Sequence, residues 1–159
     1  DDLAGEQDRG LIHEVAVGAG DSLMESVERF PSNERAWADL SYALVLQAHG
    51  QPEQAVRLGR EAEFAARQAL RGSDQVAEFW VRLGVALDLQ DRWGEGGLAF
   101  GRAVRLAPRQ PVVWYYQGYH FSQKPMTREM AKAALATCLR LDPWYDEAKL
   151  LHTALERSP

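Results

Sequence analysis

The feature that most constrains this chain is a pattern of large and small residues that recurs at helical spacing. Between residues 78 and 108 the residues of one such pattern are Trp80, Leu83, Gly84 and Leu87. They follow one another at i, i+3, i+4 and i+7, which places them on one face of an α-helix. A second set with similar spacing follows a short polar turn and consists of Gly96, Phe100 and Ala103. The segment therefore predicts two amphipathic helices joined by a turn and closed by Pro108.

The same skeleton occurs again on both sides of this segment. Trp114 lies 34 residues after Trp80, and the pattern that it opens continues with Gln117, Gly118, Phe121, Ala131, Leu135, Cys138 and Pro143. A looser copy begins at Trp37, 43 residues before Trp80. The longer spacing falls mostly in the stretch from Glu63 to Asp74, which predicts a lengthened second helix in that copy.

This pattern resembles the tetratricopeptide repeat, in which W-x2-L-G-x2-Y, A-x3-F and a proline recur every 34 residues. The resemblance covers about residues 33–143 and departs from the signature at Ser41, Gln117 and Gly96, which replace a glycine, a leucine and an alanine. It implies an all-α fold, a right-handed α-α superhelix of stacked antiparallel helical hairpins. Stacking buries the apolar face that a single short hairpin leaves open.

We expect one domain over residues 1–159, with repeats at 33–72, 77–110 and 111–143 and a capping helix at 144–157. Residues 1–31 are expected to form a degenerate N-terminal hairpin of two helices, broken at 18–21 with Asp21 as an N-cap. Pro111 and Pro143 are expected in first helical turns, with Asp142 as an N-cap. The repeated tryptophans are expected to face the inside of each pair.

Composition limits the partners. The formal net charge of −5 is mild and the 18 Lys and Arg residues are scattered, which argues against nucleic acid. No apolar run is long enough to span a bilayer, so no membrane span is expected in this chain. Cys138 is the only cysteine and is expected in the core, which leaves the compartment open.

The sequence offers little catalytic chemistry. The four histidines are expected in four different elements, and none has metal-ligand spacing with another: His13, His49, His120 and His152. His13 and Glu14 begin a zinc-protease pattern, but Val17 stands where its second histidine would be. The glycines at 94–97 lack the lysine and serine of a phosphate-binding loop and are expected at the turn between two helices. We therefore expect no catalytic residue, cofactor or bound metal.

The candidate binding residues lie on the first helix of each repeat, which lines the concave face in repeats of this kind. Helical spacing selects Arg35, Ala38, Tyr42 and Val45, then Glu78, Val81, Arg82, Val85 and Asp88, and finally Val112, Tyr115, Tyr116, Tyr119 and Ser122. A purely solvated face would be rich in Lys and Glu, whereas valine and tyrosine are typical of binding surfaces. Only Arg35 and Arg82 are cationic in this set, so the lysine and asparagine clamp by which some family members hold a terminal carboxylate is not expected.

These residues predict a non-catalytic protein-interaction module that binds a peptide segment with apolar anchors in its concave groove, with Arg82 pairing an acid of the ligand. One alternative is a self-assembling scaffold, a homo-oligomer formed through exposed ends or the surface around Phe64 to Leu70. Another follows from the start at Asp1 instead of methionine: the chain would be a piece of a longer protein, the substrate-recruiting arm of an enzyme or of a secretion or maturation complex.

Overall fold

The computed structural model describes residues 17–157, which form α-helices and two short 3-10 helices and contain no β-strand. A helical segment over residues 17–29 comes first. The following α-helices are α2 (Glu34–Gly50), α3 (Ala55–Gly72), α4 (Ala77–Asp88), α5 (Trp93–Leu106), α6 (Pro111–Ser122), α7 (Arg128–Leu141) and α8 (Asp146–Arg157). The 3-10 helices η1 (Pro52–Gln54) and η2 (Pro125–Thr127) precede α3 and α7. The expected all-α class is confirmed.

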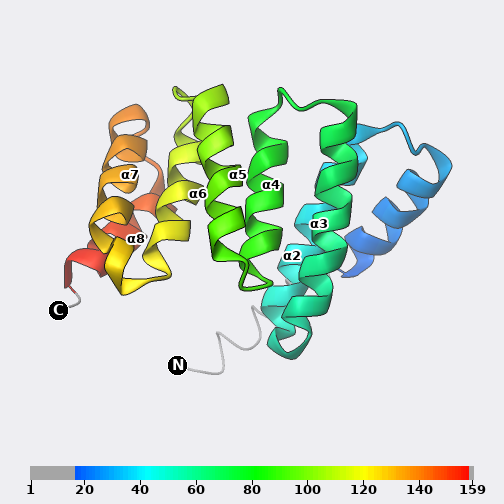
Figure 1. Cartoon of the computed structure of the whole chain (residues 1–159), viewed down its shortest axis with the longest axis horizontal. Coiled ribbons are helices and arrows are strands. Elements are labelled where there is room, and N and C mark those ends of the chain that lie inside the picture. Colours follow the sequence, from blue (N-terminus) through cyan, green and yellow to red (C-terminus); the bar gives the residue numbers. More distant parts are fainter. Residues whose placement is uncertain (1–16, 158–159) are drawn as a thin grey trace.

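The helices stack as a row of hairpins. Helix α2 packs on α3, α4 on α5 and α6 on α7, and the second helix of each pair also packs on the first helix of the next. Figure 1 shows the pairs side by side in sequence order, with α8 against the last pair. The expected superhelix of antiparallel hairpins with a C-terminal capping helix is therefore confirmed.

A small residue in the first helix of each pair lets the second helix come close. A Cβ atom at Gly84 would lie 2.7 Å from the ring of Phe100, and one at Gly118 would lie 2.7 Å from Cγ of Leu135. Both large partners are fully buried. Ser41 takes this place in the first pair, where its hydroxyl donates a hydrogen bond of 2.8 Å to the carbonyl of Ala62. The departure from glycine at this position thus supplies a buried inter-helix hydrogen bond.

The three repeated tryptophans have a shared structural role. Trp37, Trp80 and Trp114 each donate the indole N–H to the carbonyl oxygen of the residue six positions earlier, at 2.8 Å in all three cases. Each ring is half-buried and packs against core residues, as the expected inside position requires. The indole therefore holds the segment that precedes each pair against the core of that pair.

The first pair is longer than the next in both of its helices. Helix α2 has 17 residues against 12 in α4, and α3 has 18 against 14 in α5. The expectation of a long second helix is confirmed, but the first helix contributes slightly more to the longer spacing, with five additional residues against four.

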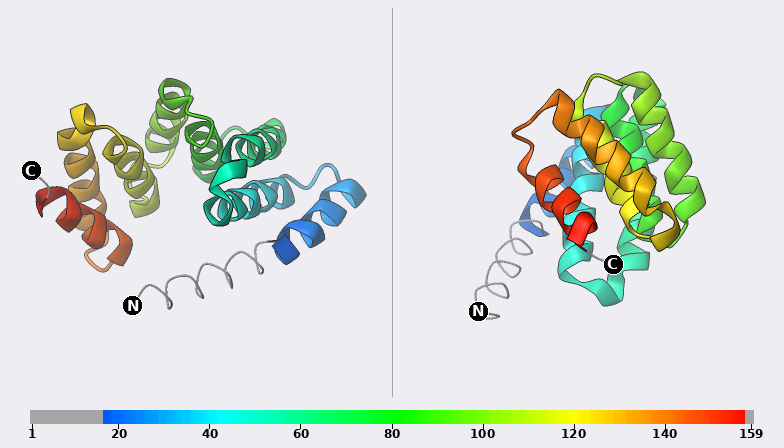
Figure 2. Two further views of the ribbon diagram at one scale, coloured as in Figure 1. Left: turned by 90° about the horizontal axis from the view of Figure 1, so that it is seen from below. Right: turned by 90° about the vertical axis from the view of Figure 1, so that its left-hand side faces the viewer.

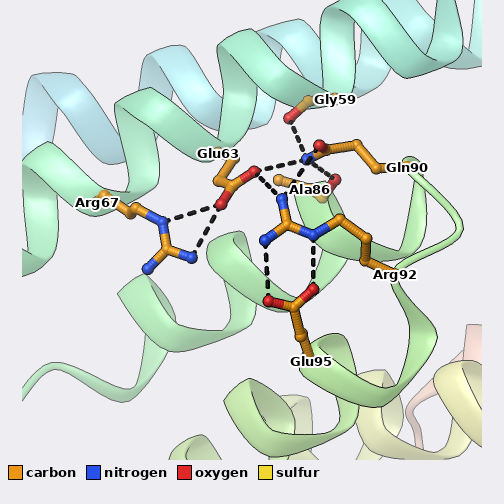
Figure 3. A network of polar contacts seen from close by, with 7 residues as sticks. All are labelled: Gly59, Glu63, Arg67, Ala86, Gln90, Arg92 and Glu95. Atoms are coloured by element: carbon orange, nitrogen blue, oxygen red, sulfur yellow. Dashed lines mark hydrogen bonds and ion pairs between the residues drawn. The ribbon is translucent and has the colours of Figure 1, made fainter.

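A network of charges joins the first two pairs on the outside of the stack (Figure 3). The carboxylate of Glu63 on α3 accepts hydrogen bonds from Arg67, from Arg92 at 2.7 Å and from the amide of Gln90 at 2.8 Å. Arg92 also holds Glu95 through two bonds of 2.6 and 2.9 Å. Burial alone would raise the pKa of Glu63, but the hydrogen bonds from Gln90 and Arg67 and the charge of Arg92 lower it.

Three local expectations were wrong. Residues 17–29 are helical without a break, so Asp21 lies inside a helix and is not an N-cap; the earlier half of the expected hairpin, with His13 and Glu14, lies outside the described residues. Leu23 and Val27 pack against the core and hold the helix despite its two glycines.

The other two concern where helices begin. The glycines at 94–97 belong to the first turn of α5 instead of the turn before it. Helix α8 begins at Asp146, because the carboxylate of Asp142 accepts the backbone N–H of Trp144 at 3.0 Å and holds Pro143 in a turn. Pro111, by contrast, opens α6 as expected.

The close approach at Gly84 gives a first prediction. Replacing Gly84 by Ala places a methyl group against the buried ring of Phe100, and we expect a loss of about 1–2 kcal/mol in the free energy of unfolding despite the higher helix propensity of alanine. Gly94→Ala is the matched control, since a Cβ there meets nothing within 4 Å; it should be neutral or stabilising by up to about 1 kcal/mol. Urea unfolding measures both, and equal effects would contradict the packing argument.

The lowered pKa of Glu63 gives a second prediction. A carboxyl group whose pKa is lower in the folded than in the unfolded state stabilises the fold above its unfolded value of 4.5, and this stability is lost as the pH falls through the folded value. Glu63→Gln should therefore cost about 1 kcal/mol at pH 7 and progressively less below pH 4.5. Unfolding followed from pH 7 to pH 3 tests this, with the exposed Glu53→Gln as the control that should change little at any pH.

Candidate functional site

The first helices of the pairs form the inner side of a curved stack. Consecutive members of the series α2, α4, α6 and α8 have Cα atoms within 8 Å of one another, whereas among the described helices α3, α5 and α7 do not. Helices on the inner side of an arc must lie closer together than those on the outer side. Figure 2 shows the arc in its left view. The concave face is therefore built from α2, α4 and α6.

A cavity of about 180 Å³ opens on this face. Its walls are mainly aromatic and aliphatic and include one histidine and one arginine. The lining residues are Tyr42, Val45, Leu46, His49, Arg82, Val85, Tyr115, Tyr116 and Tyr119. Tyr42 and Tyr119 are 40% and 38% exposed, so part of each ring is open to solvent beside the cavity. A cavity of about 150 Å³ can hold a benzene ring, so this one has room for one large side chain.

Two further hollows adjoin it. One of about 330 Å³ is lined by Tyr42, Glu78, Val81, Arg82, Gln110, Val112 and Tyr116. The other, of about 80 Å³, is lined by His49, Val85, Asp88, Leu89, Tyr119 and Gln123. The three hollows share residues and form one groove across α2, α4 and α6.

Most of the residues selected from the sequence lie along this groove. Arg35 and Ser122 are not among the lining residues of the three hollows; Arg35 is bonded to Glu78, and the hydroxyl of Ser122 donates to the carbonyl of Tyr119. The expectation for Ala38 was wrong, because it is fully buried against Ala69 and Phe79. Val45 and Val81 line the groove as members of the buried core.

Sequence reasoning missed five residues of the groove, which are Leu46, His49, Leu89, Gln110 and Gln123. Leu46 and His49 line the central cavity and follow Tyr42 at i+4 and i+7, so continuing the helical spacing by one more turn would have found them. Gln110 precedes the first residue of α6 and lines the larger hollow. Its position between two repeats carries no pattern that marks it.

A group of charged residues stands at one end of the groove. The carboxylate of Glu78 accepts a hydrogen bond of 2.6 Å from Arg35 and one of 2.8 Å from Arg82. The guanidinium of Arg82 lies over the ring of Tyr42, with 4.2 Å between the guanidinium carbon and the ring centroid. Burial would raise the pKa of Glu78, but both arginines together lower it, so the carboxylate is ionised at neutral pH.

Two of the groove tyrosines, Tyr115 and Tyr116, keep their hydroxyl groups neutral. Burial raises the pKa of Tyr115 to about 12, and burial also raises the pKa of Tyr116 although the charge of Arg82 opposes it. These phenols therefore act as hydrogen-bond donors and as apolar surface at physiological pH, and not as bases.

Asp88 is held by the fold. Its carboxylate lies 2.8 and 3.0 Å from Nδ1 of His120 and accepts a hydrogen bond of 3.0 Å from Gln123. His120 is fully buried and stacks on the ring of Trp93 at a centroid distance of 4.4 Å. Asp88 thus connects α4 to α6 and has less freedom to meet a ligand than an unpaired carboxylate would have.

The remaining chemistry along residues 17–157 is sparse. No group of three or more His, Cys, Asp or Glu side chains in this range is arranged to hold a metal ion. Burial raises the pKa of Cys138 to about 11, so its sulfur is a neutral thiol at physiological pH. The helices of the described range include none with the length and hydrophobicity needed to span a bilayer.

Comparison with known proteins identifies the fold. No protein-family model matches the chain, and no curated protein is similar to it in sequence. Among solved structures it is similar to TTC0263, a thermophilic tetratricopeptide-repeat protein of Thermus thermophilus, with 17% identity, a TM-score of 0.76 and coverage of 95% of this chain and 76% of that one.

Two other structures are similar over most of their length. MamA matches with 16% identity, a TM-score of 0.61 and coverage of 89% of this chain and 86% of that one. YrrB, described as a tetratricopeptide-repeat protein with an unusual peptide-binding site, matches with 14% identity, a TM-score of 0.52 and coverage of 86% and 82%. The chain has the tetratricopeptide-repeat fold.

Proposed function

We propose that this chain is a non-catalytic protein-interaction module that binds a peptide segment of a partner protein in its concave groove. The observation that carries the proposal is the convergence of four tyrosines from α2 and α6 on one cavity: Tyr42, Tyr115, Tyr116 and Tyr119. Arrays of helical hairpins present extended concave surfaces of this kind for binding. Tyrosine is among the residues that dominate the energy of protein interfaces.

The groove fits a ligand with an apolar anchor. Its central cavity is lined mainly by aromatic and aliphatic side chains, and its size suits one large side chain of a peptide. The backbone of α2, α4 and α6 is fixed by packing against the outer helices, so binding orders the peptide more than the protein. YrrB shares this fold and is described as having a peptide-binding site, which agrees with the proposal.

A second candidate is self-association through the other side of α2. There a cavity of about 390 Å³ is lined by Met24, Trp37, Leu40, Leu44, Arg60, Glu61, Phe64 and Ala65. Phe64 and Met24 are 58% and 45% exposed, so this surface offers apolar area that a second copy of the chain could cover. Leu70, also considered from the sequence, packs into the core instead.

Light scattering over a range of concentrations tests the second candidate. Self-association through this surface predicts a dimer whose dissociation constant rises at least about tenfold in Phe64→Asp, because a charge replaces an exposed apolar contact. Tyr119→Ala serves as the control and should leave the dimer unchanged. A wild-type chain that stays monomeric at high concentration would remove this candidate.

Peptide binding is tested with ligands selected on the full chain from a random peptide display library. We expect Tyr119→Ala to weaken a selected peptide by at least about 1 kcal/mol in a calorimetric titration, because the ring is a large part of the cavity wall. Its partial exposure predicts little change in melting temperature. Leu98→Ala, a change at an exposed residue of α5, is the control and should leave affinity unchanged. Equal affinity for wild type and Tyr119→Ala would place the ligand outside the groove.

A further inference from the structure

We propose that Glu78 occupies, in the free protein, the place that an acidic side chain of the partner takes in the complex. The groove would then select peptides in which an acidic residue stands next to an apolar or aromatic anchor. This inference rests on the proposed function, because it concerns the partner and the regulation of the same groove.

The charges around Glu78 are unbalanced. One carboxylate serves two arginines, with Oε2 at 2.6 Å from Arg35 and Oε1 at 2.8 Å from Arg82. Asp39 and Glu34 also lie close enough to Arg35 to raise its pKa together with Glu78. Arg82 has no such additional carboxylate among its contacts within the described residues. The positive charge of Arg82 is therefore less compensated than that of Arg35.

Arg82 is held in place for a carboxylate and is incompletely used by Glu78. Its side chain is 14% exposed and is held over the ring of Tyr42, so little side-chain freedom remains to be lost on binding. Glu78 contacts only the terminal nitrogen Nη2, while Nε is buried and has no hydrogen-bond partner in the part of the chain that the structure describes. A guanidinium binds a carboxylate best through two parallel N–H donors, and the present contact uses one.

Glu78 is the partner that can move. Its side chain is 39% exposed, and the Arg35 side chain that it also contacts is 53% exposed. Ion pairs with this much solvent contact contribute little net stability, so exchanging the carboxylate of Glu78 for one from a ligand costs little. Glu78 therefore competes with the acid of the ligand for Arg82. This competition lowers the affinity for acidic peptides and excludes peptides that bind weakly.

The anchor and the acid come from neighbouring positions of one peptide. Tyr42, Arg82 and Tyr116 line both the central cavity and the larger hollow that contains Glu78, so the two hollows meet at these three side chains. A ligand side chain in the central cavity and a ligand acid at Arg82 are thus close to each other. Adjacent residues of a peptide, whose Cα atoms lie about 3.8 Å apart, can reach both.

The test uses peptides from the display selection on the full chain, each made in an acidic form and in a form with the amide in place of that acid. We expect the wild type to prefer the acidic form by about fivefold. Glu78→Gln should tighten binding of the acidic form by about fivefold and change the amide form less than twofold, because only the acid competes with Glu78. Calorimetric titration measures all four affinities.

Two further variants keep the outcome decisive. Glu95→Gln removes a carboxylate that is paired with Arg92 on the outer face and should change neither peptide's affinity. Arg82→Lys keeps the charge but loses the planar fork, and it should reduce the preference for the acidic form. This second variant also tests the inference if Glu78→Gln does not fold.

The inference and the proposed function fail differently. If selected peptides lose affinity in Tyr119→Ala but show no preference for an acid beside the anchor, the groove stands and the role of Glu78 is overturned. The same holds if Glu78→Gln weakens both peptide forms equally, which would make Glu78 a structural link between α2 and α4. If no peptide is selected at all, the proposed function fails and this inference with it.

Discussion

The close approach of the two helices in each hairpin is the constraint on which the rest of the structure depends. Gly84 and Gly118 leave room for a large buried side chain of the opposite helix, and Ser41 donates a hydrogen bond across the same position. Because the contact recurs at the same place in each pair, successive pairs repeat the same geometry. The regular arc, and with it the groove on the inner side, follows from this repetition.

This construction separates the residues that hold the fold from most of those that face the groove. The outer helices and the floor of the inner ones form the core, whereas Tyr42 and Tyr119 stand partly in solvent. Their replacement removes binding surface without opening a cavity in the core. Asp88 is an exception, since its bonds to His120 and Gln123 make it part of the packing between α4 and α6. Groove residues therefore differ in how far they can change independently of the fold.

Much of the fold could be predicted from the sequence, because a tryptophan and a small residue recur at the same helical spacing in each pair and each has a local physical role. The same local reasoning failed where tertiary contacts decide: packing of Leu23 and Val27 keeps a helix intact through two glycines, and Asp142 forms a turn that delays α8. Helical spacing predicted most of the residues that line the groove, but it did not predict how these residues contact the rest of the fold. It could not reveal that Ala38 is buried between its own repeat and the next one, or that Gln110 reaches the groove from a connection between helices.

The distribution of charge along the groove sets its two ends apart. Beside the first turn of α4 two arginines share the carboxylate of Glu78, whereas at the last residue of α4 the carboxylate of Asp88 is already satisfied by a histidine and an amide. Ligands that differ in charge are therefore distinguished mainly at Arg82, which lines the apolar cavity that binds the anchor. Apolar burial is non-directional and gives affinity without register, while a single oriented guanidinium fixes where along the groove a peptide sits. The apolar cavity thus provides affinity for the peptide, and Arg82 fixes the position of the peptide along the groove.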